Sequence, residues 1–409
     1  MIKSQQYDLL ATPQGRPGIE SGRTRRARPD EDPGSPLGIY AKNPSGTVKQ
    51  AFSDSARQQG RAERFALKSV VGRLLPESRT SKCMRWQVPG QQTSIHLSTE
   101  HRRAFFSGLQ VCASVWACPV CAAKISERRR VELVSAIATA KAMSLQVHLL
   151  TLTVPHGLGD DVRVVLARIL EAWKKTTHGR AGQGIRAAFQ IRGMIRALEV
   201  THGKNGFHPH LHVLVFSAGS HSPQDFQSAF SPLWQKVCIA AGLSSPSDEH
   251  GCKVSDGSYA ARYASKWGLE SEMTKNHLKK GKSGSRSPWD FLRDVFEKRD
   301  SHEKSAALFR VYAAAFKGRR QLVWSVGLRD LLGLGVVATD EEIADQIQDE
   351  AVVLAQITPE EWSAILRTKS ECLILEIAEK RPEKLAYALN AIREIFSPPL
   401  PDRVPHPWA

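Results

Sequence analysis

Residues 207–216 constrain the fold more than any other stretch of the chain. The segment reads Phe-His-Pro-His-Leu-His-Val-Leu-Val-Phe, with a histidine at every second position before an apolar tail. Successive side chains of a β-strand point to opposite faces, so His208, His210 and His212 share one face of the predicted strand. The chain has only 14 histidines. Three of them within five residues favour metal or phosphate chemistry over a half-exposed strand that carries histidines by chance.

The residues before this strand predict its partner in a β-hairpin. Residues 195–201 read as a strand, and residues 202–206 end in Asn-Gly, a common two-residue turn. A loop of Asn-Gly alone would place Glu199 opposite His212, and a four-residue loop would place it opposite His210. Both keep Glu199 on the histidine face, whereas an odd-length loop would move it to the other face. Two histidines and a carboxylate suit a divalent cation that must also bind substrate.

Only two of the three histidines can hold one ion. Residues two apart on a strand are separated by about 6.6 Å, so the outer pair is about 13 Å apart along the backbone. An unbroken apolar run follows His212, whereas a pair that began at His208 would be followed by a third histidine. We therefore predict that His210 and His212 bind the ion with Glu199. His208 is expected beside them, as a helper or a phosphate contact.

The histidine strand resembles the central motif of the HUH endonucleases, named for histidine-hydrophobic-histidine. Two further motifs of that family have counterparts in the expected order. Residues 149–155 resemble its apolar strand with threonines, and residues 259–266 resemble its helix with a nucleophilic tyrosine and a lysine three residues later. The run 196–203 is most similar to rolling-circle replication initiators of plasmids, and residues 317–325 resemble a segment near the end of that domain. The resemblance covers roughly residues 80–335.

The resemblance implies a nickase that starts rolling-circle replication with Mg²⁺ or Mn²⁺ at the histidine site. Tyr263 would cut one strand at an origin, form a 5′-phosphotyrosine link and later allow the strands to be rejoined. The partners would be single-stranded and origin DNA, a host polymerase primed by the released 3′-hydroxyl, and a host helicase. A Gly-x-x-x-x-Gly-Lys-Ser/Thr motif is absent, so the chain has no evident helicase of its own. The alternatives are a transposase or relaxase with the same chemistry, or a non-catalytic zinc-bearing DNA-binding protein.

The tyrosine chemistry can also be argued without the family. A tyrosine with an ordinary pKa near 10 is ionised in about one molecule in a thousand at pH 7, a shortfall of about 4 kcal/mol. A divalent cation on a phosphate oxygen supplies several kcal/mol. Lys266 shares a helical face with Tyr263, where it would stabilise the phenolate or the charge on phosphate. Tyr259, one turn earlier, is either a second nucleophile or a residue that packs or stacks on a base.

Four cysteines precede the first motif. Cys112, Cys118 and Cys121 end in a Cys-x-x-Cys pair, and Cys83 would complete a tetrahedral structural Zn²⁺ site. His101 is an alternative fourth ligand, and a redox pair or ordinary buried thiols are the competing interpretations. The chain has seven cysteines, an odd number that argues against a disulfide framework and favours a reducing, cytoplasmic environment.

The net charge agrees with a nucleic-acid partner without proving it. The chain has 57 Lys and Arg against 41 Asp and Glu, a formal net charge of +16, which attracts polyanions. The predicted DNA contacts lie directly after the cysteines and in a loop beyond the tyrosine helix, and are Arg128, Arg129, Arg130, Lys279, Lys280 and Lys282. Trp267, Trp289 and Phe291 flank that loop, where they would stack on unpaired bases or pack in the core.

Composition and pattern divide the chain into four regions. Residues 1–65 are predicted to be basic and disordered, 66–145 to hold the cysteine-rich segment and a basic helix, 146–335 to form the nickase domain, and 336–409 to be helical. Neither a signal-peptide core nor a membrane-spanning run is evident. We expect an α+β fold: an antiparallel sheet with the HUH hairpin at its centre, covered by helices, plus a small zinc-binding segment and a helical C-terminal appendage.

Overall fold

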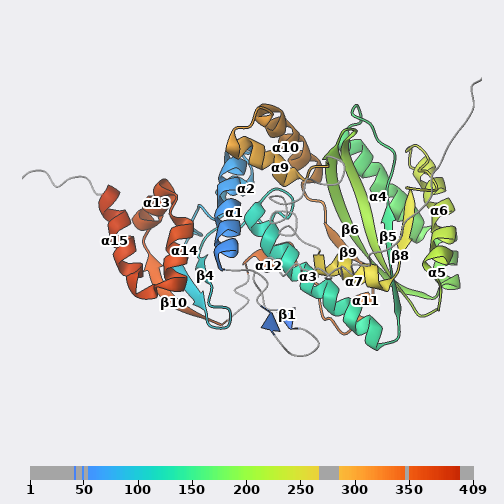
Figure 1. Cartoon of the computed structure of the whole chain (residues 1–409), viewed down its shortest axis with the longest axis horizontal. Helices are drawn as coiled ribbons and strands as arrows, with labels where there is room; N and C mark the ends of the chain where they lie inside the picture. Colours follow the sequence, from blue (N-terminus) through green and yellow to red (C-terminus); the bar gives the residue numbers. More distant parts are fainter. Residues whose placement is uncertain (1–40, 43–47, 50–53, 267–284, 346–349, 397–409) are drawn as a thin grey trace, which may run out of the picture.

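The computed structural model of the chain has an α+β fold, which confirms the expected class. It describes residues 41–42, 48–49, 54–266, 285–345 and 350–396. Within these residues, antiparallel sheets of five, three and two strands are present. The five-stranded sheet lies at one end of the molecule and the three-stranded sheet at the other (Figure 1). The two-stranded pair and the helices between the two ends are β1 (Ala41–Lys42), β2 (Val48–Lys49), α1 (Asp54–Leu74), α2 (Arg79–Lys82), α3 (Pro119–Ala142), α9 (Pro288–Glu297), α10 (His302–Phe316) and α12 (Asp340–Asp345).

The five-stranded sheet has the order β8-β5-β7-β6-β9, and each pair of neighbours is antiparallel. Its strands are β5 (Gln146–Leu152), β6 (Ile191–Gly203), β7 (Gly206–Ser217), β8 (Cys252–Ser255) and β9 (Leu322–Trp324). The predicted hairpin is formed by β6 and β7. Glu199 pairs with His210 and Gly203 with Gly206, so the loop is the two residues between these glycines. This is the register expected for a four-residue loop, because pairing continues one step closer to the turn.

The turn of this hairpin depends on Gly206, whose φ is +89°. A side chain at this position would be strained in that backbone conformation. The Asn-Gly signal therefore located the turn correctly, although glycine forms the first residue of β7 rather than the second residue of the loop. The one-step difference preserves the parity of the strand, and Glu199 remains on the histidine face.

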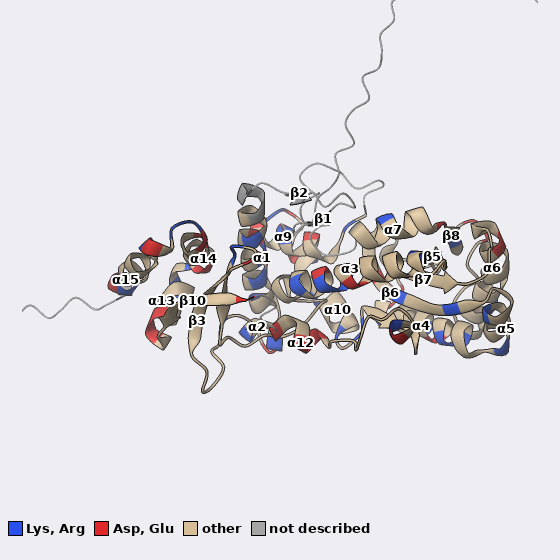
Figure 2. Cartoon of the chain, turned by 90° about the horizontal axis from the view of Figure 1, so that it is seen from below, with Lys and Arg blue, Asp and Glu red and all other residues tan. Residues whose placement is uncertain are grey.

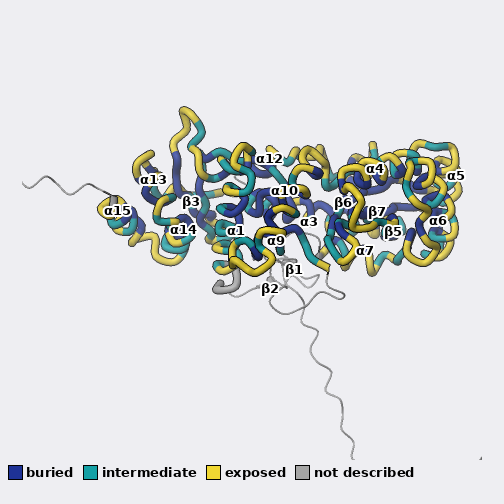
Figure 3. The backbone as a smooth tube through the Cα atoms, turned by 90° about the horizontal axis from the view of Figure 1, so that it is seen from above, coloured by how far each residue is buried: buried dark blue, intermediate teal, exposed yellow. Residues whose placement is uncertain are grey.

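Helices cover both faces of the five-stranded sheet. One face packs Ile195, Leu214 and Phe216 against α3, α7 and α11. The other packs Val213 and Val215 against α4, α6 and α10. Figure 3 shows the strands buried between helices whose outer surfaces are exposed. These two apolar faces follow from the period-two pattern of the strands. The helices around this sheet include α4 (Val162–His178), α5 (Arg180–Ala188), α6 (Pro223–Ala240), α7 (Gly257–Lys266) and α11 (Leu328–Leu331).

The C-terminal helices pack on a second sheet rather than on the first. This sheet has the order β10-β3-β4, and its core includes Ile95, Phe106, Trp362 and Ile374. We call residues 93–107 together with 351–396 the C-terminal unit. It lies at the opposite end of the molecule from the five-stranded sheet (Figure 1, Figure 2). Its elements are β3 (Thr93–Ser98), β4 (Ala104–Ser107), β10 (Ala351–Ile357), α13 (Pro359–Thr368), α14 (Glu371–Lys380), a 3₁₀ turn (Pro382–Lys384) and α15 (Leu385–Phe396).

The pairing of β10 with β3 joins residues that sequence patterns assign to two separate regions. No local sequence pattern predicts this pairing, because two strands that pair across some 250 residues carry no periodic signal that relates one to the other. The start of α13 is encoded locally: Thr358 and Glu361 form a reciprocal capping box, with Pro359 in the first turn. Among the described residues, no helix has the length and apolar character needed to cross a bilayer.

Candidate metal centre and nucleophile

Glu199, His210 and His212 meet on one face of the β6–β7 hairpin. Each offers one ligand atom, and these atoms lie within 4.8 Å of one another. Oε2 of Glu199 is 3.6 Å from Nε2 of His210 and 3.5 Å from Nε2 of His212. The arrangement follows from the register, because Glu199 is directly opposite His210 and His212 is two residues further along the same face. These three residues, which we call the Glu-His-His group, could bind a metal ion.

Hydrogen bonds at Nδ1 favour the metal-binding tautomer of both histidines. Nδ1 of His210 lies 3.1 Å from the carbonyl oxygen of His208, and Nδ1 of His212 lies 3.1 Å from the hydroxyl of Thr151. A carbonyl oxygen only accepts, so Nδ1 of His210 carries the proton and the lone pair is on Nε2. The Thr151 hydroxyl can accept from His212 in the same way. Both lone pairs then face Glu199, which is the state that a metal ligand requires.

The charges of the group also suit a cation. Burial raises the pKa of Glu199, but His212, His210 and the Tyr263 hydroxyl outweigh it and hold the pKa at about 2. Burial lowers the pKa of His212 despite the neighbouring carboxylate. At neutral pH Glu199 is therefore a carboxylate and His212 a neutral imidazole, the forms that bind divalent ions.

His208 lies beside the group and contacts a histidine that the sequence patterns did not reveal. Nδ1 of His208 is 3.2 Å from Nδ1 of His156, and its ring stacks on His210 with centroids 5.0 Å apart. Burial, His210 and His156 lower the pKa of His208 to about 3, so it is neutral. His156 directly follows Val154-Pro155, the end of the first motif. A histidine directly after the first motif was the sequence signal that could have identified His156.

Tyr263 reaches the group from α7. Its hydroxyl donates a 2.7 Å hydrogen bond to Oε1 of Glu199, and its ring lies 4.8 Å from that of His212. The helix is positioned by Ala260 and Ala264, which are fully buried against the sheet. This juxtaposition comes from residues 64 apart in the chain.

The other residues predicted around the tyrosine are arranged differently. Tyr259 is half exposed, and the guanidinium of Arg262 lies 5.1 Å from its ring centroid. Lys266 is the last residue of α7, and its side chain lies outside the described residues. Predicted residues that fall wholly outside them are Trp267, Lys279, Lys280 and Lys282. Trp289 and Phe291 are buried in the core, so core packing is the correct interpretation for both.

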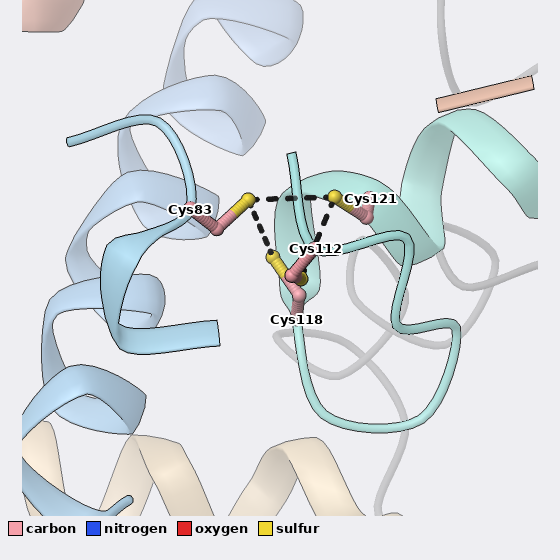
Figure 4. Close-up of side chains that lie close together, drawn as sticks. All are labelled: Cys83, Cys112, Cys118 and Cys121. Carbon is pink, nitrogen blue, oxygen red and sulfur yellow. Dashed lines mark hydrogen bonds between the residues drawn. The ribbon is translucent and has the colours of Figure 1, made fainter. Parts of the chain in front are cut away.

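The four predicted cysteine ligands converge in one buried cluster (Figure 4). Sγ of Cys83 is 3.5 Å from that of Cys121 and 3.7 Å from that of Cys118, and Cys112 is 3.8 Å from Cys121. Sulfurs at the corners of a tetrahedron with 2.3 Å zinc–sulfur bonds are about 3.8 Å apart, whereas a disulfide requires about 2.05 Å. The cluster, called here the four-cysteine group, could bind a metal ion. His101 is outside it, with Nε2 3.8 Å from Glu100.

The four-cysteine group joins separate elements and lies beside a buried cation. Cys83 directly follows α2, while Cys118 caps α3 and Cys121 lies in its first turn. Lys68 of α1 is 2% exposed, and its Nζ donates to the carbonyl oxygens of Cys83, at 3.1 Å, and Met84, at 3.3 Å. Burial lowers the pKa of Lys68, and negative charge on the cysteines opposes that shift.

The three arginines predicted to bind DNA have different environments on α3, where basic and acidic residues are interspersed (Figure 2). Arg129 is buried, with Nη1 3.2 Å from Glu132 and Nη2 2.6 Å from the carbonyl oxygen of Ala338. Arg130 forms a 2.6 Å ion pair with Glu127. Of the three, only Arg128 has an exposed side chain, and its Nε lies 3.5 Å from Glu132. In this arrangement Arg129 fastens the segment before α12 to α3, a role that no local pattern predicts.

Comparison with known proteins identifies the family. Residues 106–363, more than half of the chain, match the family described as Replication protein. The chain is 27% identical over 366 residues to "Protein rep" of Streptomyces lividans, an alignment that covers 71% of this chain and 80% of that protein. It is 29% identical over 137 residues to a "Neomycin resistance protein" of Streptomyces cyanogenus, covering 27% of this chain and 31% of that one. No solved structure matches significantly. The chain therefore belongs to the replication protein family, which confirms its resemblance to plasmid rolling-circle replication proteins.

Proposed function

We propose that this protein initiates rolling-circle replication by nicking one strand of origin DNA with Tyr263. The observation that carries the proposal is the 2.7 Å hydrogen bond between the Tyr263 hydroxyl and Glu199, which also belongs to the Glu-His-His group. It puts a nucleophile next to a site for a divalent cation, as phosphoryl transfer requires. The family match supports a replication role over the transposase and relaxase alternatives, which would use the same chemistry.

Each residue has a distinct part in the reaction. Glu199, His210 and His212 would hold Mg²⁺ or Mn²⁺, which when bound polarises the phosphate and favours the phenolate. Tyr263 is oriented by its hydrogen bond to Glu199 and attacks phosphorus after losing its proton to solvent. A phosphorus–oxygen bond to tyrosine forms as the bond to the 3′-oxygen breaks, and that oxygen takes up a proton. Attack of a 3′-hydroxyl on the phosphotyrosine reverses these steps and rejoins the strand. Lys266 and His208 would stabilise charge on phosphate.

The test is a covalent-adduct assay on supercoiled origin DNA with Mg²⁺ or Mn²⁺. We expect a protein–DNA adduct that resists SDS, and no adduct with Tyr263→Phe. Tyr259→Phe is the matched control, because it makes the same change one turn away on the same helix. If Tyr259→Phe abolishes the adduct and Tyr263→Phe retains it, the nucleophile is wrongly assigned. Tight DNA binding without an adduct under any metal would instead favour a non-catalytic DNA-binding protein.

We propose that the four-cysteine group holds a structural Zn²⁺. Four thiolates prefer zinc to Mg²⁺ or Ca²⁺, and the closed, buried cluster leaves no open position for a substrate. Hydrogen bonds from the Cys118, Cys121 and Cys83 thiols hold the pKa of Cys112 far below its ordinary value, whereas contacts with the other thiols and burial raise the pKa of Cys118 and Cys121. Metal binding must therefore displace protons from Cys118 and Cys121. All seven cysteines are free, which supports a reducing compartment such as the cytoplasm. A host helicase and polymerase complete the proposed partners.

A further inference from the structure

Residues 317–320, Lys-Gly-Arg-Arg, form an exposed cationic loop between α10 and β9. All four residues are exposed. Among the described residues, Lys317, Arg319 and Arg320 have no ion-pair partner, in contrast to Arg129, Arg130 and Arg293, which are paired with carboxylates. Three unpaired positive charges within four residues repel one another, so this loop gains more from a polyanion than the paired arginines do.

Two hydrogen bonds hold the backbone of the cationic loop, and a third holds Gln321, the residue that follows it. The carbonyl oxygen of Arg320 accepts from Nη2 of buried Arg196 at 3.2 Å, and that of Arg319 accepts from Nε1 of Trp116 at 2.6 Å. The carbonyl oxygen of Gln321 accepts from the backbone N–H of Leu198 at 2.8 Å. Every one of these bonds uses a main-chain acceptor. The backbone is fixed while the charged side chains remain exposed, which lowers the entropic cost of binding an anion.

The loop leaves the sheet beside the Glu-His-His group. Strand β9 pairs with β6 so that Leu322 lies opposite Ala197. The Leu198–Gln321 hydrogen bond continues the same antiparallel register by one residue. The next position on β6 is Glu199, and the next residue on the other chain segment is Arg320. The cationic loop therefore begins at the level of the carboxylate that accepts from Tyr263.

The residue that fixes Arg319 belongs to the loop between two of the clustered cysteines. Trp116 lies between Cys112 and Cys118 and is 6% exposed. Its carbonyl oxygen accepts from the Tyr312 hydroxyl at 2.8 Å, and its ring packs on Phe316 with centroids 4.8 Å apart. Phe316 is the last residue of α10, immediately before the cationic loop. The cysteine segment and the cationic loop are thus joined through one indole.

We propose that Lys317, Arg319 and Arg320 bind the phosphodiester backbone of the DNA strand that enters the Glu-His-His group, with Trp116 as the residue that positions them. The identity of that strand as the one cleaved rests on the proposed function. The contacts are to phosphate, so the loop contributes affinity and alignment rather than base recognition.

The first test measures binding without cleavage. The full chain is titrated with a fluorescent oligodeoxythymidine, without added divalent cation, over a series of KCl concentrations. Each phosphate contact on single-stranded DNA contributes about 0.7 to the slope of log affinity against log salt, so changing Lys317, Arg319 and Arg320 to Gln should reduce the slope by about 2. Changing Lys174, Arg180 and Arg186 to Gln removes the same charge from exposed positions on α4 and α5 and should leave the slope unchanged. Equal slopes for the two triple variants would overturn the proposal.

One additional variant makes this result specific. Arg319→Lys with Arg320→Lys should retain most of the salt slope, because the charge is kept. The binding assay requires no chemistry, because no divalent cation is added. Failure of the adduct assay would therefore refute the nickase without affecting this inference, and equal slopes would refute the loop without affecting the nickase.

The second test separates positioning from packing at Trp116. Trp116→Phe keeps an aromatic ring but removes the N–H that holds Arg319, and a lost hydrogen bond should weaken oligodeoxythymidine binding by about two- to tenfold. In the background of the triple loop variant the same change should have no further effect, because no charges remain to be positioned. An equal loss in both backgrounds would show that Trp116 acts only on packing and would overturn its positioning role.

Discussion

At the scale of single residues, the Glu-His-His group depends on partners that fix its imidazoles. The carbonyl oxygen of His208 sets the tautomer of His210, and the Thr151 hydroxyl can accept from Nδ1 of His212 and so favour the same tautomer there. Partners of this kind commonly change metal affinity by about 10- to 100-fold when they are removed. The first of them is main chain and cannot be mutated, so Thr151 is the residue through which this idea can be tested.

Thr151→Val removes the hydroxyl and nearly preserves the shape of the side chain. We expect the Mn²⁺ concentration for half-maximal adduct formation to rise at least about tenfold, because His212 is then free to adopt the other tautomer. Thr153→Val is the matched control: the Thr153 hydroxyl donates to the carbonyl oxygen of His250, away from the group, at 2.7 Å. Equal metal requirements for the two variants would show that Thr151 does not orient His212.

At the scale of helices and strands, the features that could be predicted from the sequence are those that local patterns encode. The alternation in residues 207–216 and the Asn-Gly signal indicated the hairpin, and strand parity alone placed Glu199 with His210 and His212. The Cys-x-x-Cys spacing likewise led to the cluster. The pairing of β10 with β3 could not be predicted, because it joins residues far apart in sequence whose encounter depends on the packed fold. The burial of Arg129 could not be predicted from the sequence for the same reason.

Asp294 provides an element-scale prediction, because it joins α9 to the start of α10. It accepts hydrogen bonds from Ser305, Ser301 and Arg299 and is paired with Arg286. Burial raises the pKa of Asp294, but these partners outweigh it and hold the pKa below its ordinary value. A carboxyl group with a lowered pKa contributes stability above its unfolded pKa of about 3.9, and the contribution is lost as the pH falls through the folded value.

We therefore expect Asp294→Asn to lower the melting temperature at pH 7. The difference from the unchanged protein should shrink as the pH is lowered below about 4. Asp300→Asn, at an exposed position between the same two helices, is the control and should have little effect at either pH. A difference for Asp294→Asn that stays constant from neutral to acidic pH would mean that its charge is not the source of stability.

At the scale of the whole molecule, the four-cysteine group lies between the C-terminal unit and the five-stranded sheet. It joins the end of α2, the loop after β4 and the start of α3, the helix that runs on to cover the five-stranded sheet. Through Trp116 it also contacts the segment beside the Glu-His-His group. A metal there would link the C-terminal unit to the sheet that carries the Glu-His-His group, so its loss should be felt as global destabilisation rather than as a local defect.

Cys83→Ser should reduce the zinc content of the purified protein and lower its melting temperature, because three thiolates close a tetrahedral site poorly. Cys238→Ser is the control: this thiol is also fully buried but stands outside the four-cysteine group. Elemental analysis of both variants checks the first point and thermal unfolding the second. Equal zinc contents in the two variants would exclude Cys83 as a ligand, whatever their stabilities.

A substitution of Lys68 tests whether the four-cysteine group carries net charge when metal is bound. Four thiolates around Zn²⁺ leave an excess of negative charge in a buried site, and Lys68 is a buried cation beside it. Lys68→Gln keeps a hydrogen-bond donor for the carbonyl oxygens of Cys83 and Met84 but removes the charge. We expect faster transfer of zinc to a chromogenic chelator, because the thiolates lose their compensating charge. Lys82→Gln removes an exposed charge next to Cys83 and should not change the rate. Equal rates for both variants would show that the cluster is neutralised by its own protons rather than by Lys68.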